Sequence, residues 1–368
     1  MTVEIKLRDY SIVGAENTTA LQKGLAAADW YKSPIQRAEL KTLVKRRDWP
    51  GIRDTLIWLV ALMASGTIAW KSWGTWWAVP AFFVYGTLYA SPSDSRWHEC
   101  GHRTAFKSQW LNDVVYQIAS FCVLRQPTPW RWSHTRHHTD TIIVGRDPEI
   151  NATRPPDVMN ILLNVFNLSF GVRELCRMLL HSLGRLTREE QEFIPVSERW
   201  KVYLVAWIWC AIFTAVIAWS IGTRSILPLM FIGLPSFYGA WLHLVFNLTQ
   251  HAGLAEDVLD HRLNTRTVYL NPIFRFIYWN MNYHVEHHMF PMVPYHALPQ
   301  LHEKIKADLP PAYPSLFKTY REIIPTLLRQ LNDPGYYVPR TLPSSARPMQ
   351  PTSTEPVQQP HVTATAKA

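Results

Sequence analysis

Four long stretches of the chain carry no charged residue, and they come in two pairs. The first pair covers residues 55–70 and 72–93, with only Lys71 between them, and the second covers 202–223 and 225–250, with only Arg224 between them. A helix needs roughly 20 apolar residues to cross a bilayer. The first stretch is shorter, but Arg53 and Lys71 can extend their charged ends towards water. The pattern therefore predicts two helical hairpins in a membrane, with a buried hairpin of a soluble core as the alternative for the first pair.

The residues between and around the pairs have a different character. Residues 110–124 are apolar but too short to cross, and residues 161–183 alternate apolar and charged positions, as an interfacial amphipathic helix or a packed helix would. Pro228 and Pro235 predict a kink in the last stretch. We therefore expect a cytoplasmic segment 1–54, a membrane domain 55–334 and a disordered tail 335–368 that is rich in Pro, Ser, Thr and Gln.

Charge places these hairpins relative to the membrane. Basic residues such as Arg46, Arg47 and Arg199 crowd the outer flanks, whereas the turns hold only Lys71 and Arg224. By the positive-inside rule, both termini and the region between the hairpins are expected in the cytoplasm. The start of the chain has no signal-peptide pattern. The fold class is therefore an all-α membrane protein with four spans and a cytoplasmic helical cap.

Composition agrees with this picture. The chain has 17 tryptophans, a residue enriched at membrane interfaces, and a net charge of +9. Because the basic residues flank apolar stretches and no nucleic-acid motif is present, anionic lipid headgroups explain the charge better than nucleic acid. The four cysteines show no CxxC spacing, so disulfides are not expected.

Eight of the 15 histidines fall into three clusters, HECGH, HTRHH and HVEHH. Side chains at i, i+3 and i+4 share one face of a helix, so each cluster can direct several imidazoles at one point. Imidazole binds iron, copper and zinc, and one structural zinc needs only four ligands. Two metal ions are therefore expected, and the spacing alone does not choose the metal. Cys100 lies inside the first cluster but is not needed as a ligand.

These clusters, in this order around two hairpins, resemble the three histidine boxes of the membrane fatty acid desaturase family. The flanking sequences WRWSHTRHH and NYHVEHHMFPMVPYHALPQLH resemble that family as well. The resemblance implies a centre of two iron ions that uses O2 to remove two hydrogens from a carbon pair. It also implies a further ligand at His251 in NLTQH, and a metal-bound water held by Asn247. The implied metal ligands are His98, His102, His134, His137, His138, His251, His284, His287 and His288.

The resemblance also raises the question of the electron donor. No fused cytochrome domain is evident, so electrons are expected from a separate ferredoxin, rubredoxin or cytochrome. Four acids next to the boxes could accept a hydrogen bond from a ligand histidine: Glu99, Asp140, Asp147 and Glu286. His296 and His302 are left out of the metal set. His243, within the last stretch, is either a substrate-channel residue or a helix contact.

The acceptor of the reaction is less determined. By resemblance, an apolar tunnel for a fatty acyl chain is expected along Tyr238, Gly239, Trp241, Leu242 and Phe246. The alternatives are a small non-lipid metabolite, for which Arg96, Arg125, Arg131 or Arg136 would matter more, and a hydroxylase or ketolase of the same superfamily. A membrane metal-binding or transport protein is a further alternative, but the boxes lie outside the spans, whereas transport sites lie at mid-membrane.

Overall fold

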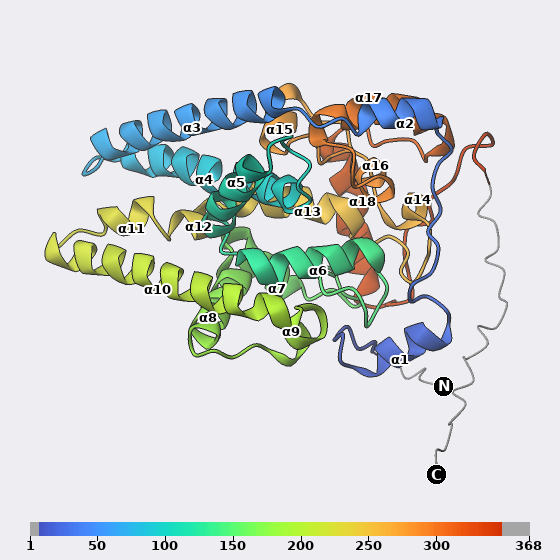
Figure 1. Ribbon diagram of the computed structural model, residues 1–368, viewed down its shortest axis with the longest axis horizontal. Coiled ribbons are helices and arrows are strands. Elements are labelled where there is room, and N and C mark those ends of the chain that lie inside the picture. The colour runs from blue at the N-terminus through green and yellow to red at the C-terminus, as the bar shows by residue number, and fades with distance from the viewer. Residues whose placement is uncertain (1–6, 348–368) are drawn as a thin grey trace, which may run out of the picture.

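The computed structural model describes residues 7–347, and the regular elements in that range are helices joined by loops (Figure 1). Within it there are no strands, only isolated bridges between Thr267 and Tyr283 and between Val268 and Tyr313. The all-α expectation is confirmed. The long helices extend together from one end of the molecule, and the shorter elements gather at the other end, where the described chain also begins.

The first predicted hairpin is formed by α3 (Asp48–Lys71) and α4 (Ala78–Gly101), which pack side by side. Gly74, with φ +85°, lies in the turn between them, where tryptophans are exposed, Trp76 by 92%. Apolar side chains on the outer face of α3, such as Val60 and Met63, are also exposed. In α4 the ten residues 91–100, which precede its final Gly101, are all buried although many are polar. The end of α4 therefore belongs to the interior of the protein.

The second predicted hairpin is only partly regular. Its first arm is α10 (Arg199–Gly222), but residues 225–250 are broken into α11 (Leu227–Phe231), α12 (Pro235–Tyr238) and α13 (Trp241–His251). Pro228 and Pro235 each lie in the first turn of a short helix, and Gly233 between them has φ +98°. The predicted kink is thus a full interruption of the helix.

Two helical segments of residues 7–347 are long and apolar enough to cross a membrane, Arg37–Lys71 and Val196–Gly222. They contain α3 and α10 respectively. Two of the four spans expected from the sequence meet this test of length and hydropathy. The other two do not meet it, because α4 ends in polar residues and breaks precede α13, and the four-span arrangement stays a prediction.

Between the hairpins lie α5 (Gln109–Cys122), α6 (Pro127–Thr139), α7 (Val158–Leu163), η1 (Asn164–Phe166), α8 (Leu168–Ser182) and α9 (Arg188–Phe193). The helix predicted over 161–183 is divided at Asn167, which has φ +54°. Met178 of α8 packs on Ala206 and Trp209 of α10, while Val172 and Leu179 are exposed. One face of α8 therefore packs against α10, and apolar side chains on its other face are exposed.

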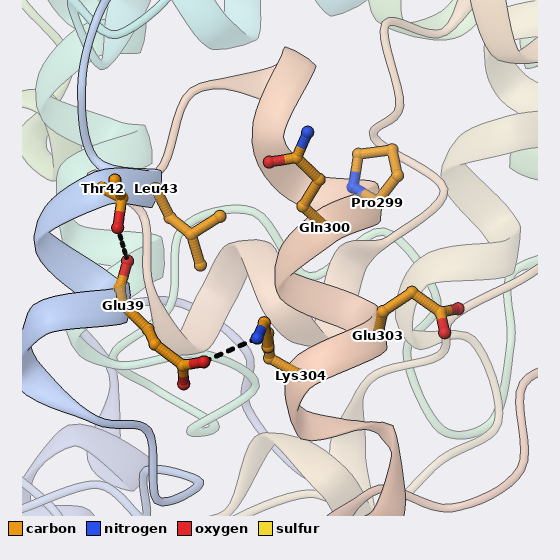
Figure 2. A pocket seen from close by; sticks show the side chains of 7 residues that line it. All are labelled: Glu39, Thr42, Leu43, Pro299, Gln300, Glu303 and Lys304. Carbon is orange, nitrogen blue, oxygen red and sulfur yellow. Dashed lines mark hydrogen bonds and ion pairs between the residues drawn. The ribbon is translucent and has the colours of Figure 1, made fainter.

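The remaining helices come from the N-terminal segment and from the C-terminal half of the chain. They are α1 (Ala15–Gln22), α2 (Arg37–Leu43), η2 (Val196–Glu198), α14 (His261–Asn264), α15 (Pro272–Ile277), α16 (His284–Met289), η3 (Tyr295–Ala297), α17 (Leu298–Ile305), η4 (Lys306–Asp308) and α18 (Leu316–Gln330). Lys304 of α17 pairs with Glu39 of α2 at 2.6 Å across a surface groove that no histidine lines (Figure 2).

Part of the predicted tail is ordered against this body. Val338 N donates to Gly253 O at 2.9 Å, and Arg340 Nη1 donates to the Tyr313 hydroxyl at 2.5 Å. Residues 336–347 of the predicted tail therefore include residues that hydrogen-bond to the body of the protein. Residues 348–368 of the predicted tail lie outside the described residues.

Candidate metal centre

The nine histidines expected as ligands come together from four helices, although the sequence separates them by up to 190 residues (98 to 288). They form two groups. The five-histidine group holds His98, His102, His134, His138 and His287, and the four-histidine group holds His137, His251, His284 and His288. Within each group, one nitrogen from every ring lies within 4.8 Å of all the others.

The spacing of each cluster explains how its helix divides the ligands. His98 lies near the end of α4, and His102 is the residue that caps this helix. The two are one turn apart and belong to the five-histidine group. In α6, His134 and His138 are likewise one turn apart, whereas His137 is turned by about 100° and enters the other group. In α16 the same spacing assigns the residues to the opposite groups. His284 and His288, one turn apart, belong to the four-histidine group, and His287 belongs to the five-histidine group.

The ring nitrogens that face one another are Nε2 atoms. His98 Nε2 lies 2.9 Å from His287 Nε2, His134 Nε2 lies 3.1 Å from His102 Nε2, and His288 Nε2 lies 3.1 Å from His284 Nε2. Two nitrogens that each lie about 2.1 Å from one metal ion, at a right angle, are about 3 Å apart. The buried Nε2 of His251 has no hydrogen-bond partner among residues 7–347. The donor set therefore fits two metal ions, one in each group.

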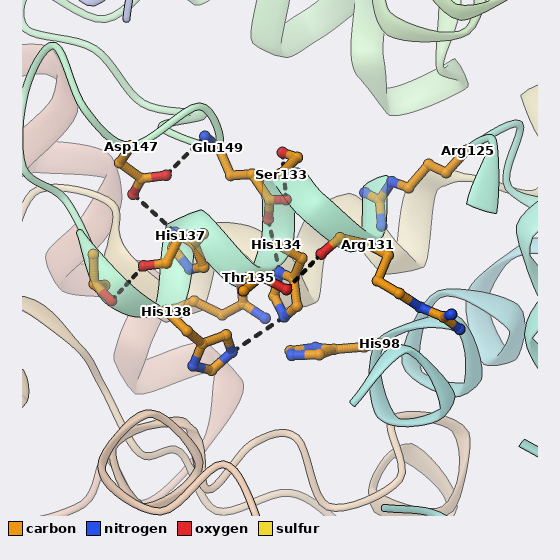
Figure 3. Close-up of polar contacts among 12 residues, drawn as sticks. His98, Arg125, Arg131, Ser133, His134, Thr135, His137, His138, Asp147 and Glu149 are labelled. Atoms are coloured by element: carbon orange, nitrogen blue, oxygen red, sulfur yellow. Dashed lines mark hydrogen bonds and ion pairs between the residues drawn. The ribbon is translucent and has the colours of Figure 1, made fainter. Parts of the chain in front are cut away.

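Several of the outward-facing nitrogens are held by the protein (Figure 3). His137 Nδ1 lies 2.8 Å from Asp147 Oδ2, as expected from the sequence, and His134 Nδ1 lies 2.9 Å from Glu149 Oε2. His251 Nδ1 donates to Asn264 O at 2.9 Å. These contacts leave Nε2 of each ring as the atom that faces the group, and they fix the ring orientation.

The other three acids behave differently. Glu99 Oε1 is 3.5 Å from His287 Nδ1, which is an ion-pair distance rather than a hydrogen bond. Asp140 pairs with Arg146, and Glu286 accepts from Thr267 and contacts His302. Of the four acids proposed from the sequence, Asp147 is thus the one that hydrogen-bonds to a histidine of the two groups.

Comparison with known proteins bears directly on this geometry. The fatty acid desaturase family model matches residues 74–320, a range that contains all nine histidines. The chain belongs to the fatty acid desaturase family. One relative is a probable fatty acid desaturase, DES1, of Sorghum bicolor, 29% identical over 326 residues that cover 80% of this chain and 74% of that protein.

Other desaturases are more distant. The Delta(5) fatty acid desaturase fat-4 of Caenorhabditis elegans is 27% identical over 55% of this chain, and the match spans about half, 51%, of that relative's length. The acyl-lipid omega-3 desaturase (cytochrome b5) of the endoplasmic reticulum of Arabidopsis thaliana is 24% identical over 73% of this chain and 70% of its own. Relatives named as desaturases imply an oxidoreductase.

Burial sets the protonation of the histidines in the two groups. It lowers the pKa values of His134 and His138 well below the ordinary histidine value, and neighbouring histidines lower them further. For His137, burial also lowers the pKa, but the Asp147 carboxylate outweighs it and the pKa is raised. Neutral imidazole is the metal-binding form. Burial thus keeps most of these rings ready to bind at neutral pH.

A cavity of about 410 Å³ borders both histidine groups. His98, His134, His137, His251 and His284 line it, together with Asn247, which lies one turn before His251 on α13. Most of its remaining wall is polar, and includes Asp94, Arg125 and several asparagines. Asn247 therefore lines the same cavity as histidines of both groups, and its role in holding a water stays a prediction.

The expected apolar tunnel residues lie elsewhere. None of Tyr238, Gly239, Trp241, Leu242 and Phe246 lines this cavity. Phe246 and Leu242 are buried in an apolar cluster, where Phe246 stacks on Tyr278, and Trp241 Nε1 donates to Thr87. Gly239 packs directly against Gly86 of α4, so that a Cβ would lie 1.9 Å from Gly86 O. Gly239 is small because two backbones meet there, and it opens no channel.

The histidines outside the metal set are also placed. His243 lines the cavity and is 8% exposed. His261, which showed no pattern in the sequence, stacks on Trp30 with ring centroids 4.3 Å apart and lies 5.0 Å from the His288 ring. His296 and Cys100 belong to neither group, as expected. Sequence reasoning missed Glu149, which lies in the loop after the second box, and Asn264, the last residue of α14, whose backbone carbonyl meets His251.

Proposed function

We propose that this protein is an oxygen-dependent desaturase whose two histidine groups each hold one iron ion. His98, His102, His134, His138 and His287 would bind the first ion. His137, His251, His284 and His288 would bind the second, with Asn247 holding a water at that ion. The observation that carries the proposal is the division of nine converging imidazoles into groups of five and four within one buried site.

The overall reaction balances with an external reductant. A carbon pair H–C–C–H loses two hydrogen atoms to become C=C, and these combine with O2, two electrons and two protons to give two waters. The bound irons would supply the oxidising power. The protein's own part is to hold the rings through Asp147, Glu149 and Asn264, and to enclose the reacting carbons away from bulk water.

The two electrons would come from a separate donor protein. Among the relatives, one of Arabidopsis thaliana is named for cytochrome b5, and another, 23% identical over 74% of this chain, is named for ferredoxin. These names support a donor of the cytochrome or ferredoxin type for this protein, with a rubredoxin as the further alternative. We also propose that the protein is embedded in a membrane with the histidine groups and both termini on the cytoplasmic side.

Two classes of substrate compete. The relatives named as acyl-lipid and fatty acid desaturases support a fatty acyl chain, in a lipid or an acyl thioester. One structural observation favours a small non-lipid metabolite as a second candidate: the cavity at the histidine groups is lined mainly by polar side chains. A hydroxylase or ketolase reaction at the same centre is distinguished by its product.

The test combines metal analysis with product analysis. Purified protein is expected to contain about two irons per chain, in line with the two groups. With O2 and a competent donor, mass spectrometry should find a product lighter than its substrate by two hydrogens. A product heavier by one oxygen would identify a hydroxylase, and one zinc without iron would overturn the proposal.

A further inference from the structure

The cavity beside the histidine groups has polar walls that a hydrocarbon chain does not need. We propose that it binds a compact group bearing hydroxyl or amino functions, either a free metabolite or a lipid headgroup, and holds that group next to the metal centre. The inference rests on the proposed function and names the chemistry of the substrate.

His243 is the first observation. It lies on α13 two turns before His251, with Asn247 between them, so that the three side chains share one face. His243 is 8% exposed, lines the cavity, and its buried Nδ1 has no hydrogen-bond partner among the described residues. A buried polar atom without a partner is costly, and beside a methylene chain it would stay without one. A hydroxyl or amino group in the cavity would supply the missing partner.

The second observation is a buried ion pair on the same wall. Arg125 Nη1 donates to Asp94 Oδ1 at 2.5 Å, and the two side chains are only 11% and 6% exposed. The guanidinium lies 4.5 Å from the Trp97 ring and 5.0 Å from the Trp130 ring, which fix its position. Burying such a pair is expensive unless further hydrogen bonds satisfy it. The pair offers a fixed donor and a fixed acceptor to a polar ligand.

The third observation is the set of amides on α7 and η1 that completes the wall. Asn160 and Asn164 line the cavity together with Asn167 beyond them. Asn164 Nδ2 donates to Asn160 Oδ1 at 3.3 Å and Asn167 Nδ2 donates to Ser236 O at 3.0 Å. An amide has a second N–H and a second oxygen lone pair, and these match a hydroxyl group, itself both donor and acceptor. Asp157 and Glu189 lie in the same wall as Arg173 and Arg177, so the lining is not of one charge sign. A hydroxylated or aminated ligand suits this lining better than a strongly anionic one.

The volume supports a compact ligand. At about 410 Å³ the cavity lies towards the small end of the usual range for ligand sites. With the predicted tunnel residues packed into other contacts, the described residues place polar side chains, and not an apolar channel, at the histidine groups. The carbon that reacts would thus belong to the polar molecule or lie close to its polar group.

The experiment uses the full chain, loaded with iron in detergent. Binding of sorbitol, glucosamine and ethanolamine, and of vesicles of phosphatidylethanolamine or phosphatidylglycerol, is measured by equilibrium dialysis or sedimentation. At least one of these is expected to bind, and His243→Phe should weaken that binding about tenfold or more, because a site built for hydrogen bonds rejects a ligand it cannot pair. His243→Gln should restore part of the affinity.

The control is Thr249→Val, which removes a buried hydroxyl of α13 that bonds Phe246 O and does not line the cavity. It should bind like the unchanged protein. Binding of the free compounds identifies a metabolite as the source, and binding of vesicles alone identifies a headgroup. If none of the probes binds, or if His243→Phe binds them or turns over a stearoyl thioester like the unchanged protein, the inference is overturned. Iron content is measured on every sample, so a protein without iron counts against the proposed function separately.

Discussion

The nine histidines differ in how firmly the protein holds the ring nitrogen that faces away from the groups. His137 and His134 have carboxylate partners at 2.8 and 2.9 Å, and His251 has a carbonyl, whereas Nδ1 of His138 and of His284 has no hydrogen-bond partner among residues 7–347. Such partners orient a ligand and raise its basicity. The metal affinity of the two histidine groups is therefore expected to depend on these carboxylates to different degrees.

Asp147 provides the sharpest test of this difference. Its carboxylate accepts from His137 Nδ1, Ile142 N and Glu149 N, each at 2.8 Å. Asp147→Asn should lower iron affinity about 10- to 100-fold, as removal of such a partner does in metal sites. Asp140→Asn is the matched control, because Asp140 pairs with Arg146 and touches no histidine of the groups. Iron retention during dialysis against a chelator measures both, and equal loss from the two variants would contradict the assigned role.

Replacing a histidine of the groups should abolish activity without unfolding the protein. His288→Ala removes one nitrogen from the four-histidine group, so desaturation and full iron loading should be lost while helical content stays. His296→Ala is the control, since His296 lies outside both groups. Activity assays and iron analysis of the two variants decide the matter, and full activity of His288→Ala would show that the third box has no part in the reaction.

For individual residues, the sequence predicted the histidines whose spacing along a helix determines the direction of their side chains. The boxes identified the histidines because three and four residues of separation fix a helix face, and the family resemblance supplied His251 and Asn247. The tunnel residues Phe246 and Leu242 were expected from the family resemblance, and the structure packs them into an apolar cluster away from the cavity. Asn247 and His243, one and two turns before His251 on the same helix face, are among the residues that line it.

Among the elements, α4 and the end of α12 bring two backbones very close together. A Cβ on Gly239 would lie 1.9 Å from Gly86 O, and one on Gly86 would lie 2.0 Å from the Tyr238 ring. Gly239→Ala should therefore destabilise the protein by about 1–3 kcal/mol, a typical cost of overpacking. Gly222→Ala, at the end of α10 with no atom within 4 Å of the added methyl group, should be nearly neutral. Thermal unfolding of the two variants in the same detergent provides the comparison.

The elements also show where hydropathy misleads. The stretch 225–250 is free of charge, yet Pro228, Gly233 and Pro235 divide it, and no helix longer than α13 forms there. Residues 91–100 of α4 are polar because they enter the buried site and not because they meet water. Absence of charge predicts contact with lipid or a core, but it does not predict helical continuity.

For the whole molecule, the basic residues at the outer ends of the hairpins predict how the protein is oriented in the membrane. A reporter fused after Gly74 or Gly222 should lie outside, because the turns at the ends of α3 and α10 hold only Lys71 and Arg224 as charges. A reporter after Asp147 should lie in the cytoplasm with the histidine groups. Accessibility of each reporter from the two sides is the measurement, and an external reporter after Asp147 would contradict the assignment.

The N-terminal segment has a consequence for how the site is made. Trp30 stacks on His261 beside His288, and Tyr31 and Ser33 donate to Asp308, 277 and 275 residues further along the chain. During synthesis the first residues leave the ribosome long before these partners exist. His288 follows His98 by 190 residues, so neither group of imidazoles can be complete until the third box has been translated. The proposed iron ions would therefore enter only after that point, and Tyr31 and Ser33 also wait past it for Asp308, their shared partner.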